Sequence, residues 1–217
     1  MGAPQFQTQD DAGIGDGISP VPEWQLELTS PHEDLLEVGD IITDPVVLNV
    51  FARLRNILQR AHQMPFPTTQ LHDLTCFTVH RLLSSISDPI VSLTSPLTEC
   101  IRYGILLFMF TIQGPTYYSH AVIFNTFARQ FTANLKPLNS VPRVYGSLDI
   151  WLYSVGMVAS VGTADYQWYT AKARDIAAYI QVVDGDEAMD CVKSVLWLEA
   201  PHADGVFRHH WNAIFDV

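Results

Sequence analysis

The chain has 217 residues, 48% of them hydrophobic, so one domain with a tail can bury a core without metal ions or disulfide bonds. Its net charge of −11 is uneven: residues 1–52 hold ten acidic side chains and no lysine or arginine, whereas residues 53–217 hold 13 acids and 12 bases. Nucleic-acid binding depends on lysine and arginine at phosphates, so we expect no direct contact with nucleic acid.

The predicted N-terminal arm covers residues 1–43. Residues 1–29 mix Gln, Asp, Gly and Pro and are expected to be disordered. A short helix is expected to begin at Ser30, where Pro31 takes the first helical position. Over residues 18–42, apolar side chains alternate with acids, a pattern typical of transcriptional activation segments. The alternative is an arm whose apolar side chains pack on the body.

Residues 44–217 carry a succession of helix signals with short links and little strand character. The predicted capping residues are Asp44, Thr69, Ser95, Asp165 and Asp184. The predicted helices cover residues 45–62, 70–86, 96–113, 117–135, 143–162, 166–181, 185–199 and 204–215. Pro137 and Pro201 are expected to lie in the connections between helices. The predicted fold is therefore all-α, a single helical bundle or stack of about eight helices with a flexible acidic arm.

The cysteines and hydropathy bear on the compartment. Cys76, Cys100 and Cys191 lie far apart, and an odd number of scattered cysteines is typical of free thiols in a reducing environment. The longest apolar run, residues 105–112, is too short to cross a bilayer, and the first residues lack a signal-peptide pattern. We expect an intracellular protein of the nucleus or cytoplasm that makes no membrane contact.

Two groups of histidines were candidates for metal binding. His72, Cys76 and His80 share one helix face, but two helical turns separate the outer pair by about 12 Å, which is too far for one ion. A core-facing stripe is the favoured interpretation. His209 and His210 are interpreted as a helix-end feature, either offsetting the C-terminal dipole or staying in water. No metal or cofactor is predicted.

Aromatic and hydroxyl side chains are dense on otherwise apolar helices. Such residues combine an apolar body with a polar tip, as in a pocket for an apolar ligand. The alternative is an ordinary helical core with satisfied hydroxyl groups. The candidate ligand-binding residues are Tyr103, Tyr117, Tyr118, His120, Tyr153, Trp168 and Tyr169.

Four of the five tryptophans, Trp151, Trp168, Trp197 and Trp211, lie in the last 67 residues, and we interpret them as core anchors. Their order, together with the segment Glu-Cys-Ile-Arg at residues 99–102, is similar to one known family. Residues 96–217 resemble the C-terminal part of the helical (middle-homology-type) regulatory domain of fungal transcription factors that carry a zinc binuclear cluster. That resemblance implies an α-helical regulatory domain that senses small molecules or contacts other regulators.

The family's DNA-binding elements have no counterpart in these residues. The zinc cluster needs six closely spaced cysteines, and the basic linker and coiled coil are also missing. The first hypothesis is therefore a regulatory protein that acts through transcription-related partners or ligand sensing. The second is a helical protein of fungal secondary metabolism that binds or transforms an apolar small molecule, for example as a metal-free cyclase or isomerase. The third is that the sequence is part of a longer gene product.

Overall fold

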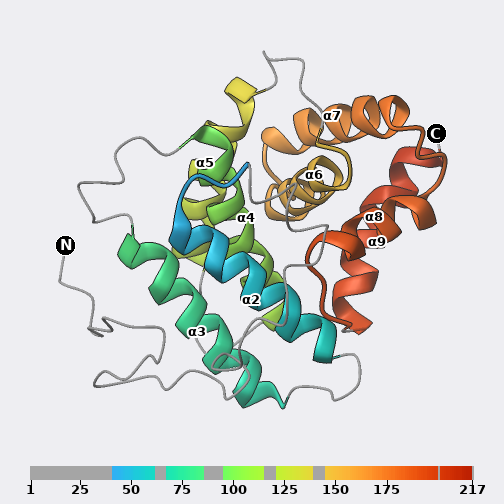
Figure 1. Ribbon diagram of the computed structural model, residues 1–217. Coiled ribbons are helices and arrows are strands. Elements are labelled where there is room, and N and C mark those ends of the chain that lie inside the picture. Colours follow the sequence, from blue (N-terminus) through green and yellow to red (C-terminus); the bar gives the residue numbers. More distant parts are fainter. Residues whose placement is uncertain are drawn as a thin grey trace. The chain divides into compact units, whose positions relative to one another are not determined.

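The computed structural model describes residues 41–61, 67–85, 95–114, 121–138, 145–199 and 201–216. These residues contain eight helices and no strand (Figure 1), which confirms the predicted all-α fold. Nearly all of the predicted acidic arm, including the helix expected at Ser30, lies outside the described residues. The helices are α2 (Pro45–Ala61), α3 (Thr68–Ser84), α4 (Pro96–Gln113), α5 (Ala121–Leu138), α6 (Ser147–Ala159), α7 (Asp165–Tyr179), α8 (Gly185–Val195) and α9 (Pro201–Phe215).

The chain divides into two compact units within α4. The first unit comprises residues 1–102, and its described helices are α2, α3 and the first part of α4. The second unit comprises residues 103–217, with the rest of α4 and helices α5 to α9. The division falls inside a continuous helix, since α4 runs through it with Gly104 two residues beyond Arg102.

Three of the predicted capping residues are confirmed. The Asp44 carboxylate accepts the backbone N–H of Val46 at 2.7 Å, at the start of α2. The Ser95 hydroxyl accepts the N–H of Thr98 at 3.1 Å, and Asp184 accepts the N–H of Glu187 at 2.8 Å. Each bond satisfies a donor that the first turn of a helix leaves without a partner.

The other two capping predictions are wrong. Helix α3 begins at Thr68, one residue before Thr69, after the extended Pro67, and no side chain caps it. Helix α7 already includes Asp165, whose carboxylate pairs with Lys136 at 2.7 Å instead of capping. In both cases the predicted cap sits inside the helix, so its side chain does not face the free backbone N–H groups.

Two prolines expected in connections lie within helices. Pro137 falls in the last turn of α5, and Pro201 is the first residue of α9 rather than only a stop for α8. A proline at the first helical position lacks only an N–H that would have no helical partner. Helix α8 ends at Val195, four residues earlier than predicted, because Leu196 is extended.

Helix α6 forms the centre of the second unit. Ten of its 13 residues, 148–157, are buried, and it packs against α5, α7, α8 and α9 (Figure 1). A helix that is apolar all round belongs in a core. Trp151 is fully buried, and its indole N–H donates to the Leu196 carbonyl at 3.2 Å. Trp211 is fully buried as well and donates to the Ser154 hydroxyl at 2.8 Å.

The interpretation of the tryptophans as core anchors is confirmed for three of the four. Trp197 is buried beside Phe108 and Phe207, with ring centroids 6.3 and 5.5 Å away. Trp168 is only half-buried. The tryptophans that mark the sequence therefore hold α4, α6, α8 and α9 together in one core.

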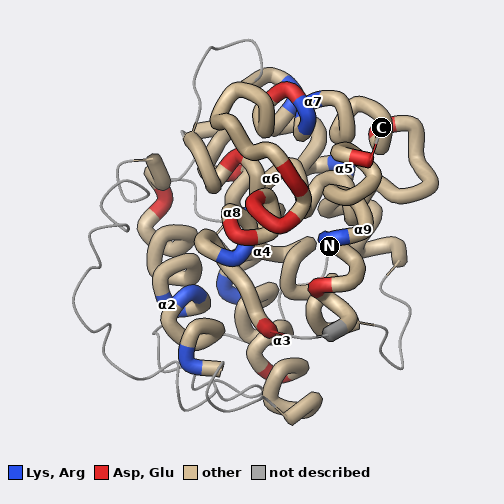
Figure 2. Tube along the Cα trace, turned by 90° about the vertical axis from the view of Figure 1, so that its right-hand side faces the viewer, with Lys and Arg blue, Asp and Glu red and all other residues tan. Residues whose placement is uncertain are grey.

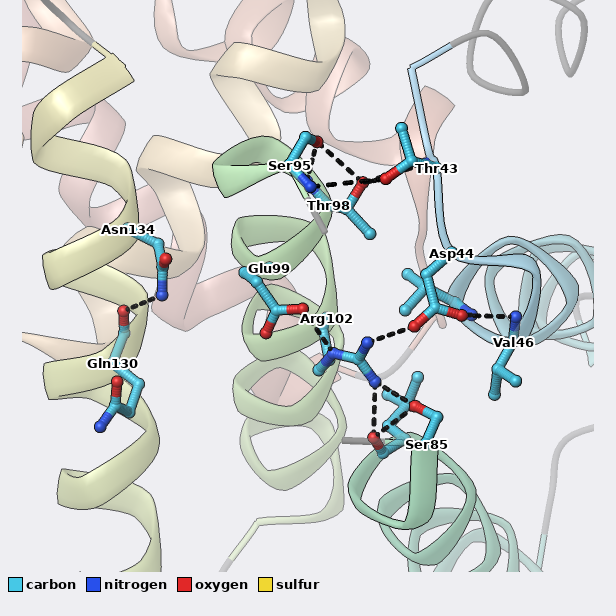
Figure 3. Close-up of polar contacts among 12 residues, drawn as sticks. Thr43, Asp44, Val46, Ser85, Ser95, Thr98, Glu99, Arg102, Gln130 and Asn134 are labelled. Carbon is cyan, nitrogen blue, oxygen red and sulfur yellow. Dashed lines mark hydrogen bonds and ion pairs between the residues drawn. The ribbon is translucent and has the colours of Figure 1, made fainter. Parts of the chain in front are cut away.

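Arg102 joins the helices of the first unit (Figure 3). Its guanidinium is completely buried and forms an ion pair with Asp44, the residue that caps α2. It also donates to the Leu82 carbonyl at 2.7 Å, to the Ser85 hydroxyl and to Glu99 at 3.1 Å. A buried charge needs such partners to offset its desolvation. One arginine on α4 thus ties the start of α2 to the end of α3.

Helix α7 ends in a Schellman motif with an unusual residue. Gln181 has φ of 63°, and the Val182 N–H donates to the Ala177 carbonyl at 2.9 Å. We predict that Gln181→Gly stabilises the protein by about 1 kcal/mol, because glycine adopts this left-handed conformation without the strain of a side chain. Urea unfolding measures the change, and Gln181→Ala, which keeps a Cβ, is expected to give no gain.

Asp149, at the start of α6, makes the stability of the second unit depend on pH. Burial raises its pKa to about 6, although the N–H of Tyr145, which donates to it at 2.5 Å, opposes the shift. The folded-state pKa therefore exceeds the ordinary value of 3.8. The stability from protonating Asp149 is complete below pH 3.8 and is lost as the pH rises through 6.

We predict that Asp149→Asn is more stable than the natural protein at pH 7.5, by on the order of 2 kcal/mol. The difference is expected to shrink toward pH 5, because the natural side chain is then protonated and neutral like the amide. Urea unfolding followed by tryptophan fluorescence at both pH values measures it. An equal difference at the two pH values would show that Asp149 does not titrate in this range.

Candidate ligand site

The structure brings together three of the seven predicted ligand-binding residues. Tyr153 on α6 lies 6.1 Å from Trp168 and 6.3 Å from Tyr169 on α7, between ring centroids, and the two α7 rings are 4.8 Å apart. Tyr103 lies elsewhere in the second unit, with its ring 6.1 Å from that of Phe127. Tyr117, Tyr118 and His120 lie outside the described residues.

Two of the three clustered residues belong to the core. Tyr169 is 1% exposed, and its hydroxyl is 2.8 Å from that of Thr132. Its ring stacks on Phe131 with 6.2 Å between centroids. Tyr153 is likewise buried. For Tyr169, an ordinary core residue with a satisfied hydroxyl is therefore a better interpretation than a ligand-binding residue. Trp168 is the member of the cluster that reaches the surface.

Trp168 carries a cation on its face. The ammonium group of Lys136 lies 5.3 Å from the Trp168 ring centroid, a cation–π distance. The same ammonium pairs with Asp165 at 2.7 Å. Lys136 thus already covers one face of the Trp168 ring and is itself paired.

A second constellation joins α7 to α9. The Tyr166 hydroxyl lies 2.8 Å from Nδ1 of His210. His210 is 7% exposed, whereas Tyr166 is half-buried. Their ring centroids are 5.4 Å apart, and the exposed His209 ring lies 5.5 Å from His210. Tyr166 thus offers a hydroxyl near the surface with a buried imidazole behind it.

Burial, and secondarily the charge of His209, lowers the pKa of His210. The imidazole is therefore neutral near pH 7. If Nδ1 accepts from the Tyr166 hydroxyl, the ring proton sits on Nε2, an assignment that follows from the bonding. In this arrangement the Tyr166 oxygen can take up a proton while its own passes to His210.

The sequence interpretation of the histidine pair as a helix-end feature is wrong, because both residues lie in the middle of α9; only the exposure of His209 to water agrees with it. His209 is exposed, but His210 is buried and bonded to Tyr166. The burial of His210 could have been predicted from the helical periodicity of α9. His210 follows the buried Phe207 by three residues and precedes the buried Ile214 by four, which places it on the apolar face.

The other histidine candidate places two ligand-type atoms near one another. The Cys76 sulfur lies 3.6 Å from Nε2 of His72, on adjacent turns of α3. Burial, and then the charge of Asp73, raises the pKa of Cys76, so the thiol rather than the thiolate predominates. Among the described residues, no three His, Cys, Asp or Glu side chains are grouped to hold a metal ion.

Two further findings concern the chain as a whole. None of the helices in the described ranges is long and apolar enough to span a bilayer. The chain matches no protein-family model, and no curated protein or solved structure matches it. The resemblance to the fungal regulatory domain therefore stays a prediction, which rests on the tryptophan order and on the segment that contains Arg102.

Proposed function

We propose that this chain is a regulatory protein that acts through transcription-related protein partners or by sensing a small apolar molecule, and does not itself bind DNA. The core positions of the family-like residues carry this proposal. Trp151, Trp197 and Trp211 join four helices in one core, and Arg102 joins three helices of the first unit. The residues on which the resemblance rests are thus among those that stabilise this helical fold.

The charges support the part of the proposal that concerns DNA. Lys136, Lys172, Lys193 and Arg208 each pair with one or two acidic side chains. Figure 2 shows acidic and basic positions next to each other at α7. Phosphate binding needs basic side chains that are free to replace counterions. These four paired bases and the net charge of −11 are poorly suited to that role.

Affinity purification of the tagged full chain from a fungal extract tests the proposal. We expect transcription-related proteins among those retained, identified by mass spectrometry against a tag-only control. A mobility-shift assay with duplex DNA at 150 mM salt is expected to show no complex. The proposal fails if no such partner is retained, or if the purified chain shifts DNA by itself.

A second candidate function is favoured by the Tyr166–His210 pair. It is proton transfer to or from an apolar metabolite, as in a metal-free isomerisation or cyclisation. Tyr166 would take a proton from the substrate while its own hydroxyl proton passes to neutral His210. The two transfers would then run in reverse and return a proton to the substrate.

Thermal-shift screening against apolar metabolites, followed by product detection with mass spectrometry, tests this candidate. Tyr166→Phe removes the hydroxyl and keeps the ring, so turnover is expected to fall about 100-fold or more. Tyr179→Phe, at an exposed tyrosine of the same helix, is the matched control and is expected to keep full turnover. Equal turnover in Tyr166→Phe would remove the pair from the chemistry.

A further inference from the structure

The corner between α7 and α8, residues 179–190, exposes two large apolar side chains. Tyr179 is 72% exposed, and Val183, four residues later in the chain, is 68% exposed. Between them, Val182 is buried and anchors the turn. Covering the two exposed side chains with a partner's apolar surface would be favourable, since burial of apolar area drives association.

The backbone of this corner is held in one conformation. On the α7 side, the Val182 N–H donates to the Ala177 carbonyl, and Gln181 occupies the left-handed region. On the α8 side, Asp184 accepts from the Glu187 N–H, and the Glu187 carboxylate accepts from the Val183 N–H at 3.0 Å. A surface fixed before binding loses little entropy when a partner docks.

The corner is strongly acidic. Its residues 179–190 include four acidic side chains, namely Asp184, Asp186, Glu187 and Asp190, and no lysine or arginine. Asp186 pairs with Arg208, whereas Asp190 is exposed and makes no ion pair with any described residue. Figure 2 shows this concentration of acidic positions at α8. The corner therefore attracts positive charge toward its apolar side chains.

We infer that the α7–α8 corner binds a basic, amphipathic helical segment of a partner protein. The apolar side chains of that segment cover Tyr179 and Val183, and its lysines and arginines face the acids of α8. This inference rests on the proposed function, because it names the surface through which a regulatory protein contacts its partner.

The charges argue against other occupants. The N-terminal residues 1–52 of the same chain hold ten acids and no lysine or arginine, so the corner repels them. A second copy in a symmetric contact would place two acidic corners against each other. Anionic lipid and nucleic acid are repelled in the same way.

Fluorescence anisotropy with the purified full chain tests the inference. The probe is a fluorescein-labelled helical peptide of leucine and lysine, and a leucine–glutamate peptide is its counterpart. We expect the lysine peptide to bind, and 0.5 M salt to weaken it. The double variant Tyr179→Ala, Val183→Ser is expected to raise its Kd about tenfold or more. Asp190→Lys is expected to raise the Kd as well, because it replaces a negative charge of the corner with a positive one.

Matched controls separate the corner from general effects. Val161→Ser changes another exposed valine of the second unit, 59% exposed, and Asp73→Lys reverses an exposed acid of α3. Both are expected to keep the natural Kd. Circular dichroism checks that every variant is folded, and the positions are exposed enough that we expect no loss of structure.

Three results would overturn the inference. They are equal binding of the lysine and glutamate peptides, an unchanged Kd in the corner variants, and a concentration-dependent dimer that the double variant abolishes. The last result would assign the surface to a second copy. If the double variant still retains the partner found by affinity purification, the inference that the corner binds this partner is wrong and the proposed function stands. If the corner binds the peptide but no partner is retained, the proposed function alone fails.

Discussion

Gly156→Ala is expected to destabilise the second unit by about 3 kcal/mol, because there is no room for a methyl group between α6 and α7. A Cβ at this position would lie 2.1 Å from Cε1 of Tyr169. The Tyr169 ring cannot move aside easily, since it stacks on Phe131 and its hydroxyl is bonded to Thr132. Urea unfolding monitored by tryptophan fluorescence measures the loss.

Gly205→Ala is the matched control for Gly156. Gly205 lies within α9 and is exposed, and no described atom would come within 4 Å of an added Cβ. Alanine favours the helix over glycine there, so this variant is expected to gain about 0.5–1 kcal/mol. Equal effects of the two substitutions would contradict the close approach of α6 and α7.

Asp44→Ala is expected to destabilise the first unit by about 3–5 kcal/mol. The substitution removes the N-cap of α2 and also one of the two carboxylates that pair with the buried Arg102 guanidinium, so that only Glu99, at 3.1 Å, remains. Denaturant unfolding of the full chain is expected to show the loss as a separate early transition, monitored by circular dichroism. The exposed pair of Lys136 and Asp165 provides a comparison, for which Asp165→Ala is expected to cost less than about 1 kcal/mol.

A second substitution separates the two roles of Asp44. Asn at this position can still cap α2 but carries no charge, so Asp44→Asn is expected to retain roughly 1 kcal/mol of the stability that alanine loses. Adding Arg102→Met to Asp44→Ala is expected to recover stability, because it removes the buried charge that Asp44→Ala leaves with Glu99 as its one carboxylate partner. If the double variant is less stable than Asp44→Ala, the guanidinium contributes through its other bonds to Leu82 and Ser85.

The sequence predicted three helix caps and the buried helix α6, because these features depend on residues that are close together in the chain. The caps at Asp44, Ser95 and Asp184 follow from a side chain that reaches a backbone N–H two or three residues ahead. The apolar block that contains Trp151 predicts a buried helix, and α6 is buried over ten residues. Helix ends were less well predicted, because proline is compatible with the start of α9 as well as with the end of α8.

The long-range contacts that hold the first unit together and build the candidate site could not be read from the sequence. Asp44 and Arg102 are 58 residues apart, and Tyr166 and His210 are 44 residues apart. Such pairs depend on how the helices pack, which local periodicity does not determine. Tyr169 was predicted for its aromatic ring, yet its surroundings make it a core residue, whereas Tyr166 went unnoticed although it is the residue bonded to His210.

The central claim is that this chain regulates through protein contacts, and tethering tests it most directly. The full chain is fused to an unrelated sequence-specific DNA-binding domain, and expression of a reporter gene with matching sites is measured. We predict that the fusion changes reporter expression relative to the DNA-binding domain alone, and that the Tyr179→Ala, Val183→Ser variant reduces this change. Unchanged reporter expression by a fusion that accumulates in the nucleus at the level of the control would contradict the claim.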